Sequence, residues 1–235
     1  MALDERKSAL LSAIIKEHIK SGEAVGSKIL VDKYGFELSG ATIRNEMMAL
    51  EKEGLIYQPH TSAGRIPTEI GWQFYLNNYL KEKALSAKEK NDLDAVIKTS
   101  EESELKVKNL AKKLAEVSRE AVIVGFNPDY IYYTGLSQLF RQPEFTEYHL
   151  ICHISEVIDH LEEVITRLFK EVAENDFKIM VGEENPFGRQ CGAIVSKFKN
   201  KKGEPGIFTL LGPARMAYEN NLALLKYSHS LLSSI

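Results

Sequence analysis

The sequence predicts an α+β protein with an N-terminal winged helix-turn-helix and a C-terminal domain built on an antiparallel sheet. Three observations predict this fold. Residues 4–54 carry three apolar stripes at helical spacing, a short hairpin pattern follows them, and strand-like runs alternate with helical ones after Ala121. With 235 residues, of which 44% are hydrophobic, the chain is long enough to form two cores.

Three N-terminal helices are expected from capping residues and apolar periodicity. A residue whose side chain can accept a hydrogen bond from the first helical turn precedes each stripe, and a glycine follows each one. The expected caps are Asp4, Ser27 and Ser39, and the glycines are Gly22, Gly35 and Gly54. Three such helices with short connections are typical of a helix-turn-helix.

A hairpin pattern follows the third helix. The apolar runs Leu55–Tyr57 and Ile66–Pro67 lie on either side of a polar loop that contains glycine, so we expect a two-stranded wing. Thr68 is expected to cap a fourth helix, whose aromatic residues from Trp72 to Tyr79 pack in the domain core. Packing of that helix against a second subunit is the alternative.

Residues 84–118 are rich in Lys, Glu, Asp and Ser and carry a sparse apolar stripe, which predicts a helical connector with a break near Thr99 to Ser103. A solvated helix face and a paired helix in a dimer both fit this stripe. The expected domains are a winged helix-turn-helix at 1–83, the connector at 84–118 and an α+β domain at 119–235.

The C-terminal part alternates between strand-like and helical patterns, which is typical of an α+β domain on an antiparallel sheet. The alternation at His149–Cys152 suggests a strand edge with a buried thiol. The expected strands are Ala121–Phe126, Tyr130–Tyr133, Phe177–Val181, Ala193–Phe198 and Gly206–Leu211. The expected helices run from His153 or Ser155 to Val172 and from Ala217 to Leu232.

Charge and cysteine content restrict the class of protein. The net charge is −3, and residues 1–83 hold eleven Lys and Arg against eleven Asp and Glu, so any nucleic-acid surface must come from local placement of charge. Cys152 and Cys191 are too few for a disulfide framework. No segment approaches the roughly 20 apolar residues of a membrane span, and the charged N-terminus does not resemble a signal peptide. We expect a cytoplasmic protein without a membrane partner.

The third predicted helix has a polar face suited to reading DNA bases. With Ile43, Met47 and Leu50 turned inward, its other face carries groups that can hydrogen-bond base edges or contact a thymine methyl. A plain solvated face is the alternative. The candidate residues are Ala41, Thr42, Asn45 and Met48 outward, Arg44 on the flank, and Ser39 at the cap of the helix.

The wing loop and the start of the second helix provide candidate contacts to the DNA backbone. Hydroxyl groups and one Arg on a hairpin tip suit phosphates and the minor groove, although an ordinary exposed turn would look the same. Ser27 and Lys28 offer a helix N-terminus and a cation, although Ser27 also fits a cap alone. The wing candidates are His60, Thr61, Ser62 and Arg65.

These stretches resemble the HrcA family of heat-inducible transcription repressors. The resemblance rests on Gly22–Lys28, Ser39–Met47, Leu50–Leu55 and Gln58–Thr68, and returns more weakly at Thr134–Phe145, Gly182–Pro186 and Leu211–Met216. It implies a winged helix joined to a GAF-like domain, a double-stranded inverted-repeat operator, a homodimer and dependence on the GroE chaperonin. The family also carries a dimerisation domain inserted after the strand that ends near Phe126, where this sequence has only a few residues.

Competing interpretations remain open. The thiols and imidazoles of His149, Cys152, His153 and Cys191 could form a zinc site. A GAF-like domain that binds a small molecule and gates the winged helix is a second regulatory hypothesis, and an interaction scaffold is a third. An enzyme is not expected, because the sequence has no nucleophile elbow, phosphate loop or zinc-protease motif, and no cofactor is implied.

Overall fold

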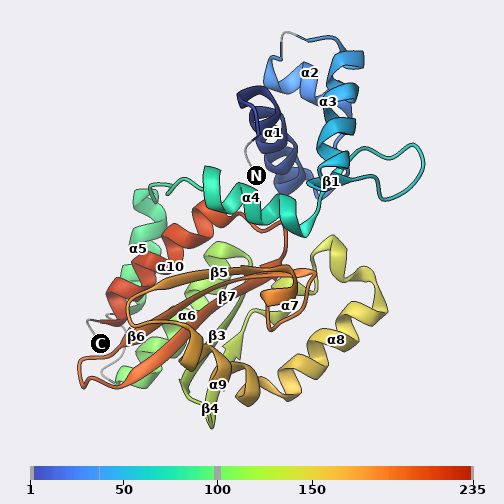
Figure 1. Cartoon of the computed structure of the whole chain (residues 1–235). Helices are drawn as coiled ribbons and strands as arrows, with labels where there is room; N and C mark the ends of the chain where they lie inside the picture. The colour runs from blue at the N-terminus through green and yellow to red at the C-terminus, as the bar shows by residue number, and fades with distance from the viewer. Residues whose placement is uncertain (1–2, 37, 98–101, 234–235) are drawn as a thin grey trace. The chain divides into compact units, whose positions relative to one another are not determined.

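The computed structural model describes residues 3–36, 38–97 and 102–233. The chain forms two compact units, Met1–Lys81 and Glu82–Ile235, and each is described by itself (Figure 1). Within the described ranges, no helix is long and apolar enough to cross a membrane.

The first unit is the expected helix-turn-helix with a wing. Its elements are α1 (Glu5–Ser21), α2 (Ser27–Tyr34), α3 (Gly40–Lys52), β1 (Ile56–Tyr57), β2 (Ile66–Pro67) and α4 (Glu69–Tyr79). Side-chain caps position three of the helices, because Asp4 accepts a hydrogen bond from Lys7 N at 2.8 Å, Ser39 from Thr42 N at 3.1 Å and Thr68 from Gly71 N at 3.1 Å. The cap predicted at Ser27 is wrong, since Ser27 is the first helical residue and Gly26 precedes it without a side-chain bond.

Close backbone contacts hold the wing against the helices. Val25 and Arg65 exchange two backbone hydrogen bonds, each 2.9 Å long, which fasten the second wing strand to the segment before α2. A Cβ atom on Gly64 would lie 2.5 Å from the Val25 carbonyl oxygen, so only glycine allows this approach. Gly71 is equally restricted, because its Cβ atom would clash with the Leu55 carbonyl oxygen. Trp72 is buried beside these contacts, as expected for a core residue.

The second unit is an α+β domain on a five-stranded antiparallel sheet, which confirms the predicted fold class. The strand order is β4-β3-β7-β6-β5, with β3 (Ala121–Asn127), β4 (Tyr130–Thr134), β5 (Phe177–Val181), β6 (Cys191–Lys199) and β7 (Pro205–Pro213). Its helices are α5 (Ala87–Ile97), α6 (Ser103–Ser118), α7 (Leu136–Leu139), α8 (Tyr148–Asp159), α9 (Leu161–Glu171) and α10 (Tyr218–Leu232), and short 3₁₀ turns lie at Pro143–Thr146 and Gly182–Glu184.

Helices cover both faces of this sheet (Figure 1). Alternate strand residues on one face form an apolar core with α8 and α9, which includes Ile123, Ile165 and Val195. The opposite face packs against α6 and α10. All five predicted strands are confirmed within two residues at each end, because period-two patterns with flanking turn residues are strong signals for a half-buried or fully buried strand.

Two sequence predictions in this unit are wrong. The single helix expected up to Val172 is two helices, α8 and α9, which meet at His160. His149–Cys152 lies within α8 rather than on a strand edge, because Leu150 and Ile154 form a helical i, i+4 pair on the core. An alternation over only four residues cannot distinguish the two-residue period of a strand from the 3.6-residue period of a helix.

The predicted connector packs as part of the second unit. Leu93, Leu110 and Leu114 on α5 and α6 are fully buried against each other, α10 and the sheet. Most of the apolar stripe is therefore used inside one chain, whereas Leu105 on α6 is 44% exposed. The break predicted near Thr99 to Ser103 falls partly on residues 98–101, which lie outside the described residues, and α6 begins at Ser103.

Candidate nucleic-acid interface

The α3 helix presents the face that the sequence analysis assigned to DNA bases. Ile43, Met47 and Leu50 are buried in the core of the first unit. Arg44 and Asn45 are exposed on the opposite side, together with Ala41, Ser39 and Met48, of which Met48 is 48% exposed. Thr42 is only partly exposed, because its hydroxyl lies 2.9 Å from the Ser39 hydroxyl that caps the helix.

Two of the exposed cations that form no ion pair within the described residues are candidate DNA contacts. These are Lys28 at the start of α2 and Arg44 on α3. Some other cations of the unit are engaged: the Lys33 Nζ atom lies 2.5 Å from Glu17 Oε1, and the Lys7 Nζ atom lies 2.7 Å from Glu53 Oε1. A cation that has no carboxylate partner is available to a phosphate without first breaking an ion pair.

The wing tip exposes small polar side chains. His60, Thr61 and Ser62 are exposed, and the Ala63 amide donates to the His60 carbonyl at 3.0 Å to close the tip. Gln58 holds the loop from inside, since its Nε2 donates to the Ala63 carbonyl at 2.9 Å. The tip is therefore a short, internally bonded turn whose hydroxyls point outward, as phosphate contact requires.

Arg65 is placed differently from the prediction. It lies at the base of the wing beside Val25 rather than at the tip, and its Nε donates to Glu51 Oε2 at 2.9 Å. Its side chain is 16% exposed. Arg65 therefore ties the second wing strand to the end of α3, a role that the loop composition alone could not reveal.

A groove of about 370 Å³ lies between α3, the start of α2 and the wing. It brings together candidates from three separate stretches of sequence, namely Ser27, Arg44, Met48, Ser62 and Arg65. Gln58 and Gly26 also line the groove and were not among the predicted contacts, although Gln58 opens the recognisable wing segment. The groove therefore joins α3 and the wing into one surface. It is lined by Gly26, Ser27, Arg44, Met47, Met48, Gln58, Ser62, Ala63, Gly64 and Arg65.

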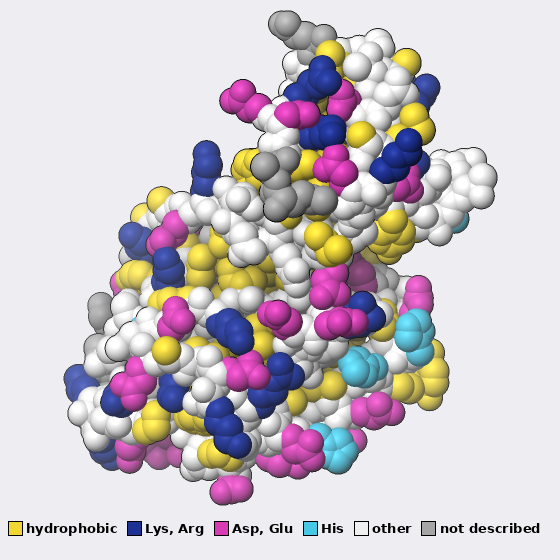
Figure 2. All heavy atoms as spheres, viewed as in Figure 1, with side chains coloured by type: hydrophobic (Ala, Val, Ile, Leu, Met, Phe, Trp, Pro, Cys, Tyr) yellow, Lys and Arg dark blue, Asp and Glu magenta, His cyan; other side chains and the backbone are white. Residues whose placement is uncertain are grey.

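The charge of the unit is locally balanced rather than broadly basic. On the face seen in Figure 2, Lys and Arg side chains are interspersed with Asp and Glu on both units. Glu17 illustrates the local pairing, because the hydrogen bond from Lys33 lowers the pKa of its carboxyl. Burial and the neighbouring Glu17 carboxylate raise the pKa of Tyr34 to about 12. Any DNA contact therefore depends on particular side chains rather than on a broad positive field.

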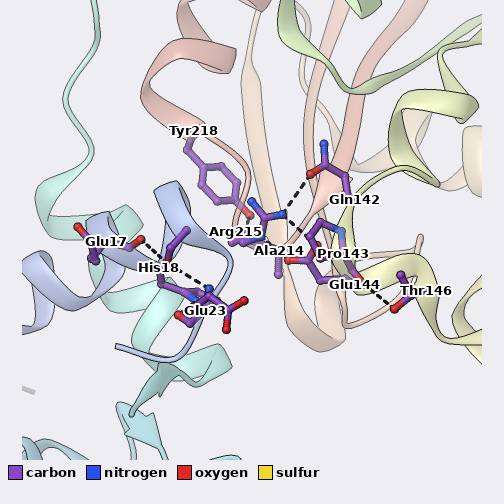
Figure 3. A network of polar contacts seen from close by, with 11 residues as sticks. Glu17, His18, Glu23, Gln142, Pro143, Glu144, Thr146, Ala214, Arg215 and Tyr218 are labelled. Carbon is purple, nitrogen blue, oxygen red and sulfur yellow. Dashed lines mark hydrogen bonds and ion pairs between the residues drawn. The ribbon is translucent and has the colours of Figure 1, made fainter. Parts of the chain in front are cut away.

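The second unit contains a polar network that joins two of the recognisable segments (Figure 3). Arg215, which follows β7, donates to both carboxylate oxygens of Glu144 and to the Gln142 side chain, with 3.1 Å to Glu144 Oε2 and to Gln142 Oε1. Tyr218 donates to the Ala214 carbonyl at 2.7 Å. The network ties the turn after β7 to the 3₁₀ turn at Pro143–Thr146, so these segments have a structural role.

The thiols and imidazoles that suggested a zinc site do not come together. Cys191 is buried in β6, where burial raises the pKa of its thiol to about 12, whereas His149 and His153 are exposed on α8. Among the described residues, the one group with ligand atoms close together is His160, Glu162 and Glu163, all exposed. Such a surface group is common without a metal, so it gives no support to a metal centre.

Comparison with known proteins places the chain in a family. The family model described as "HrcA protein C terminal domain" matches residues 71–221. The chain belongs to the HrcA family. The match runs from α4 into α10, so the relationship suggested by the N-terminal motifs of this HrcA family member extends across the whole sheet of the second unit.

The HrcA relatives differ in how much of their length is matched. The heat-inducible transcription repressor HrcA of Kineococcus radiotolerans is 39% identical over 123 residues, which cover 52% of this chain and 36% of the relative. The HrcA repressor of Synechococcus elongatus is 24% identical over 344 aligned positions, covering 98% of this chain and 97% of the relative. A crystal structure of a hypothetical protein has a TM-score of 0.78 over 99% of this chain at 18% identity, which shows the same fold.

The length difference has a structural counterpart in this HrcA chain. The alignment with the Synechococcus relative spans 344 positions although the chain has 235 residues, so that relative carries segments without a counterpart here. The connection between β3 and β4 consists of Pro128 and Asp129 alone. It therefore holds no inserted domain.

Proposed function

We propose that this chain is a sequence-specific, DNA-binding transcription repressor of the heat-shock response, which acts on chaperone operons in the cytoplasm and reads an inverted-repeat operator. Curated relatives carry the name heat-inducible transcription repressor. The observation that carries the proposal is the groove that joins the exposed face of α3 to the wing, with Arg44 exposed and unpaired among the described residues. We propose that residues 1–83 bind DNA, that residues 84–118 form a helical connector and that residues 119–235 form a GAF-like regulatory domain.

The proposed contacts fall into two groups. Arg44 and Asn45 make hydrogen bonds to base edges, because a guanidinium suits guanine and a carboxamide suits adenine. Ala41, Thr42 and Met48 offer apolar contact to thymine methyls. The backbone group, Ser27, Lys28, Ser39, His60, Thr61 and Ser62, contacts phosphates or the minor groove. Arg65 supports the wing through Glu51.

We further propose that the repressor is a homodimer. A single neutral winged helix offers few phosphate contacts, whereas a two-fold dimer presents two recognition helices to two half-sites. The buried stripe of α5 and α6 no longer supports the connector as the interface. The aromatic helix α4 remains a candidate, because Ile70 on it is 56% exposed.

Fluorescence anisotropy tests the proposed function. Labelled fragments from upstream of the chaperone operons of the source genome are titrated with the full chain, and shuffled fragments of equal length are the control. The proposal expects tight binding to fragments that carry an inverted repeat, and light scattering should give a dimer on the operator. Equal affinity for all fragments would refute sequence-specific repression.

A ligand-gated regulator is the second candidate function. Regulation by the GroE chaperonin is a further proposal, which rests on the family resemblance alone. A cavity of about 860 Å³ in the second unit favours the ligand-gated alternative, because its size lies within the range of small-molecule sites. Operator affinity measured with purified chaperonin, and separately with small molecules, shows whether the chaperonin or a small-molecule ligand regulates DNA binding.

A further inference from the structure

A large cavity of the second unit lies at one end of its sheet. It has a volume of about 860 Å³ and is bordered by the start of α6, the β3–β4 turn and the β6–β7 turn. Ligand sites in proteins commonly enclose 300 to about 1,000 Å³. Its lining residues of most interest are Glu102, Glu104, Phe126, Tyr130, Phe198 and Glu204.

Aromatic rings form the apolar part of this cavity. Phe126 and Tyr130 stack with their ring centroids 5.0 Å apart, and Phe198, which is 3% exposed, contacts Phe208 edge-on. Phe198 lies over Gly206, its partner in the β6–β7 register, where a Cβ atom would come 2.5 Å from the ring. Gly206 thus allows the ring to lie flat against the strand at the cavity wall.

The polar part of the cavity is mainly acidic. Glu102 and Glu104 come from the start of α6 and Glu204 from the β6–β7 turn, whereas Lys202 is the one lysine or arginine of the lining. Glu104 is held in its ionised form, because hydrogen bonds from Lys108 and Tyr130 lower the pKa of its carboxyl. Carboxylates next to aromatic faces favour a positively charged guest over an anion.

The chain itself shows how an ammonium group is held at this wall. The Lys108 Nζ atom lies 2.6 Å from Glu104 Oε1 and 2.7 Å from the Tyr130 hydroxyl, and it sits 5.2 Å from the centroid of the Tyr130 ring. A carboxylate and an aromatic face therefore already share one primary ammonium beside the cavity. Glu102 and Glu204, both exposed, provide further carboxylates across the remaining space.

We propose that this cavity is a binding site for an organic ammonium ion with an aromatic or similarly sized apolar group. The apolar group lies among Phe126, Phe198 and Val107, and the ammonium lies toward Glu102 and Glu204. A bound ligand joins α6 to two turns of the sheet. The inference deepens the ligand-gated function by naming its site and ligand class, and it does not depend on DNA binding.

Isothermal titration calorimetry of the full chain tests the site. The probe is 2-phenylethylammonium, and 2-phenylethanol and 3-phenylpropionate are its neutral and anionic counterparts. We expect the ammonium to bind at least about fivefold more tightly than either counterpart, because only it gains the carboxylate interactions. Tighter binding of the propionate would overturn the ligand class, and no binding of any probe at millimolar concentration would overturn the site.

A charge-matched pair of variants locates the binding. The double variant Glu102→Gln, Glu204→Gln should weaken 2-phenylethylammonium binding about fivefold and leave 2-phenylethanol unchanged. The control Glu162→Gln, Glu163→Gln removes two exposed carboxylates from α9, which do not line this cavity. Equal effects of the two double variants would overturn the assignment. Operator affinity measured alongside keeps a failed ligand site distinct from a failed repressor function.

Discussion

Glu120 makes the stability of the second unit depend on pH. Glu120 lies in the short connection between α6 and β3, and its side chain, 5% exposed, lies beside Gly212 of β7. Asn221 Nδ2 donates to its Oε1 at 3.2 Å, whereas Oε2 has no partner among the described residues. Burial raises the pKa of this carboxyl from 4.5 to about 8. The folded unit therefore binds a proton that the unfolded chain releases between these two pH values.

The sign and size of the effect follow from this shift. Because the folded-state pKa is raised, the contribution of Glu120 is fully present below pH 4.5 and is lost as the pH rises to about 8. A pKa difference of one corresponds to 1.36 kcal/mol. The rise from 4.5 to about 8 therefore lowers the free energy of unfolding by about 4 to 5 kcal/mol across this window, as an upper limit. Glu120→Gln keeps the shape of the neutral side chain and removes the titration.

Denaturant unfolding at pH 5, 7 and 9, followed by circular dichroism, tests the reasoning. The stability of Glu120→Gln relative to the unmodified chain should rise with each step in pH. Glu147→Gln, which changes an exposed carboxyl before α8, is the matched control and should show no such trend. Parallel stability curves for the unmodified chain and Glu120→Gln from pH 5 to 9 would refute a buried, protonated Glu120.

Three further predictions concern the first unit. Arg44→Ala should cost about 1 to 3 kcal/mol of binding to the operator and little on random DNA, measured by anisotropy; equal losses on both would assign Arg44 to phosphate instead. Lys28→Ala should reduce the salt slope of log affinity by about one unit with base preference intact, and an unchanged slope would exclude a phosphate contact. Gly71→Ala should destabilise the unit by more than 2 kcal/mol or so in thermal unfolding, because its Cβ atom meets the Leu55 carbonyl. Gly40→Ala is its control, since nothing lies within 4 Å of the added atom, and a similar loss there would contradict the clash.

The sequence by itself determined the N-terminal helices and the exposed face of α3. Asp4, Ser39 and Thr68 cap their helices because a side-chain acceptor next to an apolar stripe is a local signal. The inward positions of Ile43 and Met47 follow from helical periodicity alone, and so does the opposite exposed face with Asn45. These features depend on neighbours within a few residues, which the sequence displays directly.

The tertiary structure decided what each side chain meets. Arg65 looks like a free wing cation in sequence, but a contact fourteen positions away, with Glu51, holds it at the base of the wing. Leu93, Leu110 and Leu114 of the predicted connector are buried because α10 packs against α5 and α6. Glu120 acquired its raised pKa only when residue 221 and the end of β7 enclosed it. Burial and long-range pairing depend on the packing of distant segments, and a local pattern does not contain that information.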